Sequence, residues 1–334
     1  MTPKKHIIPV FVPHLGCPNS CVFCNQRKIS GRLSPACGDD VRRAIANYTA
    51  VNPKGEAAEL AFYGGSFTAV SIHAQKELLE AAAPYLEGGC ISSIRVSTRP
   101  DAIERTVLDF LSEYGVKTIE LGAQSMDDEV LVLSKRGHLS DDTKAAARLI
   151  KSMDFSLIMQ MMTGLPGDTR DKSLNTARLI AELKPDGVRI YPTVIIKETE
   201  LFEMWKCGTY SEHTVEAAVS LCADIYTIFE DAHIPVIRLG LNPTDDLSGG
   251  DAAGGAYHPA FGELVYSHVL LDKASNLISQ LSLRDSIILG VSPSCVSKMT
   301  GQKRCNIDLL KERFSLRELK IKITDVPEGT VTIL

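Results

Sequence analysis

Short apolar segments rich in β-branched residues alternate along the chain with longer segments of helical period. This alternation is typical of βα units, whose strands assemble into a mostly parallel sheet. Polar and glycine-rich motifs follow nearly every strand, so we expect an α/β fold with a partial (β/α)6 TIM-type barrel, where strand ends build the site. A doubly wound sheet is the competing architecture. The predicted strands cover residues 7–12, 59–63, 94–98, 118–122, 156–161 and 188–194.

The sequence predicts two domains with a boundary after residue 242. Residues 1–242 form the barrel, and residues 243–334 form a small C-terminal α+β domain. Residues 243–256 are rich in glycine and aspartate, which indicates a flexible entry loop. After this loop we expect helices near residues 261–281 and 307–314, and strands at residues 287–291, 319–323 and 331–334.

The 334 residues carry a net charge of −5, with an isoelectric point near 5.9. This balance argues against a broad nucleic-acid-binding surface. The sequence has no stretch of about 20 apolar residues that would span a membrane. The early apolar run is broken by Pro9 and Pro13, which makes a poor signal peptide. We therefore expect a cytoplasmic protein.

Cys17, Cys21 and Cys24 form a C-x3-C-x2-C motif directly after the first predicted strand. In a reducing compartment, clustered cysteines indicate metal or redox chemistry. Three thiolates on one loop can hold three irons of a four-iron cluster and leave the fourth iron open to a small molecule. The alternative is structural zinc, which would need a fourth ligand such as Cys37 or His14. We favour the iron–sulfur cluster because the sequence has no second pair of closely spaced cysteines.

This spacing resembles the signature of the radical S-adenosylmethionine (SAM) superfamily, whose cofactors are a 4Fe-4S cluster and SAM. The resemblance implies that Cys17, Cys21 and Cys24 bind the cluster, and that Phe23 lies against the adenine of SAM. It also implies that the motif after the second strand binds the methionine amino end through its backbone. That motif contains Gly64, Gly65 and Ser66, and glycine lets a backbone approach a ligand closely.

Further motifs look like those of the Elongator catalytic subunit, and oxygen-independent coproporphyrinogen oxidases share some of them. They lie at residues 97–101, 120–125, 135–138, 162–168, 189–193 and 200–208. By this resemblance Gln124 and Arg136 contact the ribose and carboxylate of SAM, and Gln160 lies near the ribose. Their chemistry suits these contacts, since arginine pairs with carboxylates and amides bond hydroxyls.

The sequence departs from the Elongator pattern in two respects. Many relatives carry glutamate where Ser97 stands, a position expected to bind the amino end of SAM, and serine supplies no charge. The Elongator subunit also has a C-terminal acetyltransferase domain, whereas the tail of this sequence lacks a glycine-rich acetyl-CoA-binding loop. We therefore expect a protein without that domain, and the resemblance predicts fold and cofactors better than substrate.

Substrate-specific residues are expected in the last barrel loops and the tail. The best candidate is the segment 254–263, whose glycines and proline fix an unusual loop. Within it, Tyr257 and His258 are the predicted catalytic residues, because both side chains carry exchangeable protons. The alternative is that this loop only docks the tail onto the barrel.

Together these features predict a radical SAM enzyme. It would reductively cleave SAM at a single 4Fe-4S cluster to a 5′-deoxyadenosyl radical and abstract hydrogen from a small-molecule substrate. The acidic charge and the missing acetyltransferase domain favour a small molecule over tRNA. The alternatives are tRNA-base modification and a non-catalytic protein that binds a cluster or haem. The reaction needs an electron donor, such as flavodoxin or ferredoxin.

Overall fold

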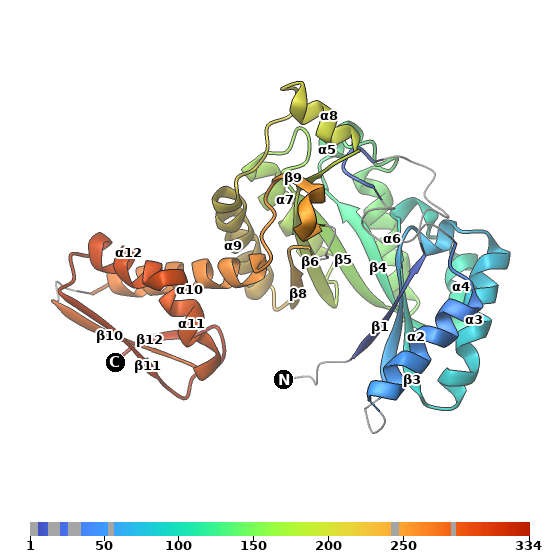
Figure 1. Ribbon diagram of the computed structural model, residues 1–334, viewed down its shortest axis with the longest axis horizontal. Coiled ribbons are helices and arrows are strands. Elements are labelled where there is room, and N and C mark those ends of the chain that lie inside the picture. The colour runs from blue at the N-terminus through green and yellow to red at the C-terminus, as the bar shows by residue number, and fades with distance from the viewer. Residues whose placement is uncertain (1–5, 13–20, 26–34, 53–56, 242–246, 282–284) are drawn as a thin grey trace.

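A curled parallel sheet forms the larger part of the structure (Figure 1). The computed structural model describes residues 6–12, 21–25, 35–52, 57–241, 247–281 and 285–334. Within these residues seven parallel strands follow the order β1-β2-β3-β4-β5-β6-β8. The partial barrel is confirmed, with one strand more than the six expected. The strands are β1 (Ile7–Val12), β2 (Ala58–Gly64), β3 (Ile91–Thr98), β4 (Val116–Gln124), β5 (Ser156–Thr163), β6 (Gly187–Pro192) and β8 (Val236–Leu239).

Helices alternate with these strands, and most of them pack on the outer face of the sheet, whereas α5 (Asp128–Leu133) and α8 (Glu200–Lys206) lie near one end of it (Figure 1). Several begin at residues whose side-chain oxygen accepts from a backbone N–H of the first turn, which stabilises the helix start. Thr169 accepts from Lys172, and Thr199 accepts from Phe202. The helices are α2 (Gly38–Val51), α3 (Ile72–Glu87), α4 (Arg105–Glu113), α5 (Asp128–Leu133), α6 (Ser140–Ser152), α7 (Arg170–Glu182), α8 (Glu200–Lys206) and α9 (Val215–Asp231).

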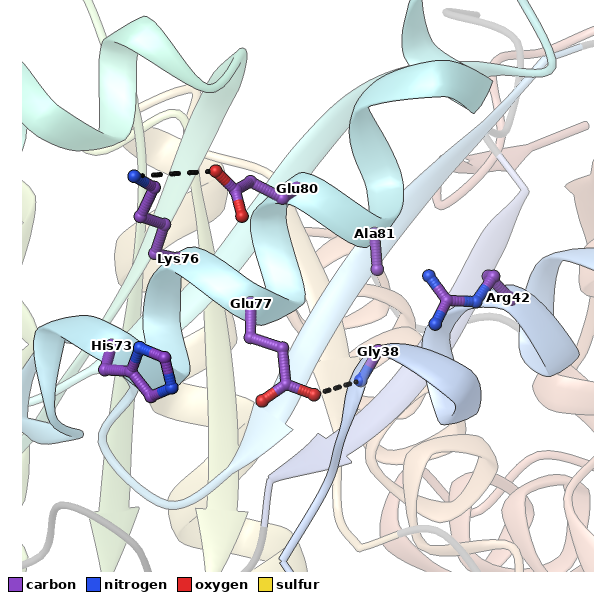
Figure 2. Close-up of a pocket in the computed structure, with 7 residues that line it drawn as sticks. All are labelled: Gly38, Arg42, His73, Lys76, Glu77, Glu80 and Ala81. Carbon is purple, nitrogen blue, oxygen red and sulfur yellow. Dashed lines mark hydrogen bonds and ion pairs between the residues drawn. The ribbon is translucent and has the colours of Figure 1, made fainter.

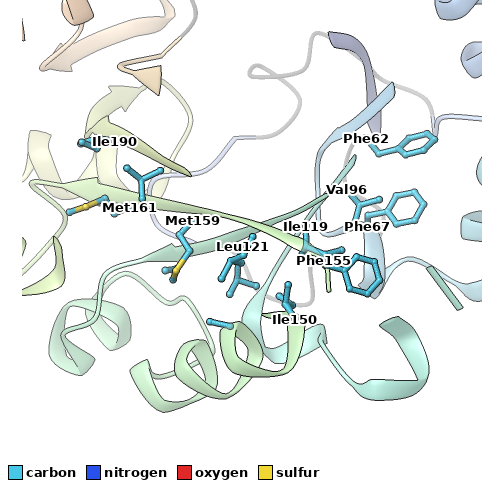
Figure 3. Close-up of a cluster of buried hydrophobic side chains, with 14 of the residues drawn as sticks. Phe62, Phe67, Val96, Ile119, Leu121, Ile150, Phe155, Met159, Met161 and Ile190 are labelled. Carbon is cyan, nitrogen blue, oxygen red and sulfur yellow. The ribbon is translucent and has the colours of Figure 1, made fainter. Parts of the chain in front are cut away.

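The main hydrophobic core lies between the sheet and its helices (Figure 3). Alternate residues of each strand point to opposite faces, so every second residue of β2 to β6 enters this core. Phe62 of β2 stacks on Phe67 with ring centroids 4.9 Å apart. Leu121 of β4, Met159 of β5 and Ile190 of β6 continue the same layer. The remaining residues of each strand therefore line the concave inner face of the half-barrel.

A short two-stranded antiparallel sheet follows β6. Its strands are β7 (Val194–Ile196) and β9 (Ala252–Gly255), which pair in the register Val194 with Gly255. Two predictions are corrected here. The expected strand 188–194 divides into β6 and β7 around Thr193, and the expected flexible loop 243–256 contains β9. Glycine-rich backbone forms this strand because β7 supplies hydrogen-bond partners, which composition does not reveal.

The C-terminal part forms a second, smaller layer of helices and strands at one end of the molecule (Figure 1). Helix α10 (Phe261–Ser279) contributes its first half to the main core and its second half to a separate core. That second core also holds α11 (Val296–Thr300), α12 (Cys305–Arg313) and a three-stranded sheet in the order β11-β10-β12. These strands are β10 (Ser286–Val291), β11 (Glu318–Ile323) and β12 (Val331–Ile333).

The predicted division between residues 1–242 and 243–334 stays a prediction. Because α10 belongs to both cores, the two parts share a continuous helix rather than a bare linker. None of the helices in the described residues is long and apolar enough to cross a membrane.

Candidate functional site

Two of the three motif cysteines lie in the described residues. Cys21 is buried, Cys24 is partly exposed, and neither forms a disulfide. They sit on a tight turn in which the Cys24 N–H donates to the Cys21 carbonyl at 3.0 Å. Between them Val22 donates to the Ser134 carbonyl at 3.2 Å, which fixes the turn beside the segment after α5. Cys17 lies outside the described residues.

Arg136 connects this turn to the end of β4. Its Nη1 donates to Cys21 Sγ at 3.3 Å, and its Nη2 donates to the Gly122 carbonyl at 2.8 Å. The backbone carbonyl of Arg136 in turn accepts from the Arg99 guanidinium. A guanidinium beside a sulfur suits a thiolate, the form in which cysteine binds iron. The contact therefore fits a metal cluster at this turn.

Gln124 and Gln160 form a pair of amides next to Arg136. Gln160 Nε2 donates to Gln124 Oε1 at 3.1 Å. Gln124 ends β4 with a positive φ of 66°, an uncommon conformation for a residue with a side chain, and such positions often mark functional sites. Gly122 leaves room for this arrangement, because a Cβ there would lie 2.8 Å from Gln124 Nε2 and 3.4 Å from Arg136 Nη2. The structure thus brings the three predicted SAM contacts together around one glycine.

The predicted glycine-rich motif lies at the end of β2. Gly64 has a φ of +109°, and Gly65 N–H donates to the Val12 carbonyl at 2.9 Å. Ser66 is buried, and its hydroxyl lies 3.0 Å from Thr98 Oγ1 while accepting from the Arg99 N–H at 3.3 Å. The Ser66 side chain therefore joins the ends of β2 and β3. A contact between the backbone of this motif and SAM stays a prediction.

His138 packs next to Gln124 and Arg136. It is buried, with Nε2 3.3 Å from the Ala123 carbonyl, next to Gln124 in the chain. Burial, followed by the positive charge of Arg136, lowers the pKa of His138 to about 4. The imidazole is therefore neutral at pH 7, and Nε2 carries the hydrogen that the Ala123 carbonyl accepts. Neutral His138 thereby avoids adding a second buried positive charge beside Arg136.

The other predicted residues occupy separate surroundings. Phe23 packs in a small apolar cluster with Leu201, Trp205 and Ile195. Tyr257 packs against β7 and Leu241, and His258 Nδ1 accepts from the Ala260 N–H at 3.1 Å just before α10. The pairing of β7 with β9 holds this loop beside the end of β6. A catalytic role for Tyr257 and His258, and an adenine contact for Phe23, stay predictions.

Comparison with known proteins decides the family. Residues 11–180 match the radical SAM superfamily, and residues 185–269 match the radical SAM C-terminal domain. The chain belongs to the radical SAM superfamily. A 4Fe-4S cluster and SAM are the cofactors of this superfamily, as the sequence predicted, and the described contacts around Cys21 and Arg136 fit them.

Several known proteins resemble this one over part of their length. The tRNA uridine(34) acetyltransferase of Dehalococcoides mccartyi is 25% identical over 252 residues, covering 65% of this chain and 55% of the relative. The archaeal Elp3 structure from Methanocaldococcus infernus has a TM-score of 0.63 and 25% identity over 79% of this chain and 62% of that one. The radical SAM coproporphyrinogen III oxidase of Escherichia coli shares the fold, with a TM-score of 0.50 and 19% identity over 69% and 54%.

These comparisons confirm the predicted resemblance to the Elongator catalytic subunit and to oxygen-independent coproporphyrinogen oxidases. They identify the chain as a radical SAM enzyme and leave its substrate open. The chain spans about half the length of the tRNA uridine(34) acetyltransferase that it matches.

The sequence analysis missed a group of charged side chains on the inner face of this radical SAM half-barrel. We call Glu59, Tyr63, Arg95, Glu120 and Arg189 the inner-face cluster. At its buried end, Glu59 is 1% exposed and accepts from Arg95 Nε at 2.8 Å. Arg95 Nη1 also donates to Glu120 Oε1 at 2.6 Å. A charged residue within each of the apolar strands β2, β3, β4 and β6 was the available signal, but the strand register was needed to show that these residues lie together.

The opposite end of the inner-face cluster is formed by Arg189. Its Nη2 donates to Glu120 Oε1 at 2.7 Å and to the Tyr63 hydroxyl at 3.0 Å, and its Nη1 donates to the Tyr191 hydroxyl at 3.3 Å. Burial, followed by the negative charge of Glu120, raises the pKa of Tyr63 to about 12, so the phenol is protonated at neutral pH. Burial acts to lower the pKa of Arg189, but Glu120, Tyr191 and Tyr63 together outweigh it, and the pKa is raised.

A cleft of about 420 Å³ lies elsewhere, between α2 and α3 (Figure 2). In this cleft the Gly38 N–H donates to Glu77 Oε1 at 3.0 Å, and Lys76 Nζ lies 3.6 Å from Glu80 Oε1. Arg42 pairs with Asp39 at 2.8 Å. Because these charged groups have partners within the two helices, the cleft belongs to helix packing on the outer face and not to the cofactor site.

Proposed function

We propose that this protein is a radical SAM enzyme that modifies an RNA base, with Cys17, Cys21 and Cys24 holding its 4Fe-4S cluster. When bound, the cluster and SAM supply one-electron cleavage of SAM to methionine and a 5′-deoxyadenosyl radical, which takes a hydrogen atom from the substrate. The electron comes from an external donor such as flavodoxin or ferredoxin. The single observation that carries the cofactor assignment is the position of Arg136 between Cys21 and Gly122.

The residues of the chain bind and orient in this reaction. Arg136 supplies a fixed cation at the cysteine turn, where a carboxylate of the cofactor gains a charge-assisted hydrogen bond. The amides of Gln124 and Gln160 face each other and provide donors and acceptors for ribose hydroxyls. Neutral His138 and the space over Gly122 keep these side chains in place. Such orientation limits side reactions of a reactive intermediate.

The substrate class rests on the relatives. The relatives named tRNA uridine(34) acetyltransferase and Elongator complex protein 3 favour RNA, and the comparisons do not support the small molecule that the sequence analysis expected. The coproporphyrinogen oxidase likeness concerns the fold alone. A small metabolite and a non-catalytic cluster or haem protein are the outcomes that would replace RNA modification. Cytoplasmic location is part of the same proposal.

The cofactor assignment is tested by the formation of 5′-deoxyadenosine. Protein reconstituted with iron and sulfide under anaerobic conditions is reduced with dithionite in the presence of SAM. We expect wild-type protein to release 5′-deoxyadenosine and Cys24→Ala to release none, because one cluster ligand is lost. Cys207→Ala is the matched control, since Cys207 is an exposed thiol at the end of α8 and should leave cleavage intact. Cleavage by Cys24→Ala would refute the ligand assignment.

The substrate class is tested in the same assay by adding purified tRNA, a small-molecule extract or buffer. Stimulation by tRNA, with a tRNA nucleoside of changed mass detected by mass spectrometry of its digest, supports the proposal. Stimulation by the small-molecule extract alone would replace RNA with a metabolite. Absence of cleavage with a complete cluster, together with haem binding, would indicate the non-catalytic protein.

A further inference from the structure

The inner-face cluster replaces the apolar side chains that usually fill a barrel interior. Two glutamates are buried there, paired with two arginines whose side chains are 11% and 13% exposed, and withdrawing charges from water costs free energy that hydrophobic residues avoid. Their charges cancel within the cluster. Around Glu59, Ser93 and Thr118 also donate to the carboxylate, at 3.2 and 2.8 Å, so this end is closed and saturated. The inner-face cluster therefore forms a polar surface, which we call the floor. Its end at Glu59, the sealed end, is buried, and the Glu59 carboxylate is fully hydrogen-bonded.

The other end of the cluster opens toward the cofactor residues. Tyr63, Ser97, Gln160 and Tyr191 are partly exposed, whereas Glu59 is buried. Strand register places Arg189 directly opposite Gln160 and Glu120 directly opposite Ser97. Directly opposed residues on one face have neighbouring side chains. A molecule on this floor would therefore lie next to the predicted ribose and amino-end contacts of SAM.

Two polar atoms at the open end are left for a ligand. Arg189 Nε is buried and has no hydrogen-bond partner among the described residues, although both of its Nη atoms are bonded. Glu120 Oε1 accepts three hydrogen bonds, but Oε2 has only the long contact of 3.5 Å from Ser97 Oγ. One donor and one acceptor thus remain on the Arg189–Glu120 pair. A buried donor without a partner is costly, and a ligand acceptor would remove that cost.

We propose that the inner-face cluster is the substrate subsite and binds the neutral hydrogen-bonding edge of a nucleobase. Arg189 Nε donates to a carbonyl oxygen of the base, and Glu120 Oε2 accepts from the adjacent ring N–H, as on the imide edge of uracil. The balanced charges favour a neutral group, because a phosphate or carboxylate would add an uncompensated charge to a buried site. This inference rests on the proposed function, whose radical would form beside the same floor.

The imide edge is tested by blocking its N–H. Uridine and N3-methyluridine are compared for binding to anaerobically reconstituted protein with SAM, by saturation-transfer NMR. A short uridine oligonucleotide and its N3-methylated form provide the polymer arm and separate free nucleoside from RNA. Whichever of the two ligands binds, the nucleoside or the oligonucleotide, we expect N3-methylation to weaken its binding at least about tenfold. The reason is that the Glu120 acceptor loses its hydrogen-bond donor. Equal binding of both forms, or binding of neither, would overturn the proposal.

Two double variants test where the base binds. Each removes one negative and one positive charge, so the net charge of the protein is unchanged. Glu120→Gln with Arg189→Gln removes one pair at the open end and leaves Glu59 and Arg95 paired. Glu59→Gln with Arg95→Gln removes the equivalent pair at the sealed end and leaves the proposed contacts. We expect the first variant to lose the preference for uridine and the second to keep it, at matched melting temperatures. Loss of the preference for uridine in both variants, or in neither, would show that Glu120 and Arg189 do not recognise the base.

SAM cleavage without nucleoside is measured on the same wild-type preparations. If wild-type protein cleaves SAM but does not distinguish uridine from its N3-methyl form, the subsite fails while the proposed cofactor chemistry stands. If wild-type protein distinguishes the two nucleosides but never cleaves SAM, the proposed function fails and the base-binding floor stands.

Discussion

His138 makes the stability of the protein sensitive to acid. Its folded-state pKa of about 4 lies below the ordinary value of 6.5, so the unfolded chain binds the proton more readily. The stabilising contribution is therefore complete above pH 6.5 and is lost as the pH falls toward 4. The shift corresponds to about 3 kcal/mol in full, of which about 2 kcal/mol is lost between pH 7 and pH 5.

The assay compares wild-type protein with His138→Gln. Glutamine keeps a donor for the Ala123 carbonyl and stays neutral at every pH, so this source of pH dependence disappears. Urea unfolding of both proteins, each prepared without cluster, is measured at pH 7 and pH 5. We expect the free energy of unfolding to fall by about 2 kcal/mol more in the wild type than in the variant.

The control is His73→Gln, because His73 is exposed on α3 and the substitution should leave the pH dependence as in the wild type. The reasoning is refuted if wild type and His138→Gln lose the same stability on acidification. It is also refuted if the two histidine variants behave alike.

Three further substitutions test the packing of the site. Gly122→Ala places a Cβ against both Gln124 and Arg136, so the SAM dissociation constant should rise at least about tenfold while the circular dichroism spectrum stays unchanged. Arg95→Met leaves buried Glu59 without its cation, while Glu120 keeps Arg189, and should lower the free energy of unfolding in urea by about 3–5 kcal/mol. Lys135→Ala breaks a surface ion pair and should cost less than about 1 kcal/mol in the same measurement. A larger loss in Lys135→Ala than in Arg95→Met would contradict this ranking.

The sequence was sufficient for most of the half-barrel. The first strand matches its predicted bounds of residues 7–12, because the apolar run begins after the polar His6 and ends before Pro13. The predictions of a strand at residues 188–194 and a flexible loop at residues 243–256 were wrong in part, because the pairing of β7 with β9 joins segments about 60 residues apart. Such pairing depends on which backbone groups remain unpaired after folding, and local composition does not record it.

That the proposed SAM-binding residues lie together was predictable by motif, and the side chains around them were not. Gln124, Arg136 and Gln160 converge as expected from the resemblance. The inner-face cluster was missed because each charged residue, taken alone in its strand, looks like an ordinary solvent-facing position. Only the register of neighbouring strands shows that Glu120 and Arg189 share a buried face. The contact between the Ser66 hydroxyl and Thr98 was likewise not predicted, since the motif indicates only a backbone contact with the ligand.

The most direct test of the account is the affinity of SAM for Arg136→Gln. The dissociation constant is measured by anaerobic calorimetry on cluster-containing protein, with Arg148→Gln as a control because Arg148 is exposed on α6. We predict at least about tenfold weaker binding in Arg136→Gln, since a charge-assisted hydrogen bond beside Cys21 is lost, and no change in Arg148→Gln. Equal affinity in wild type and Arg136→Gln would contradict the claim that SAM binds between Cys21 and the end of β4.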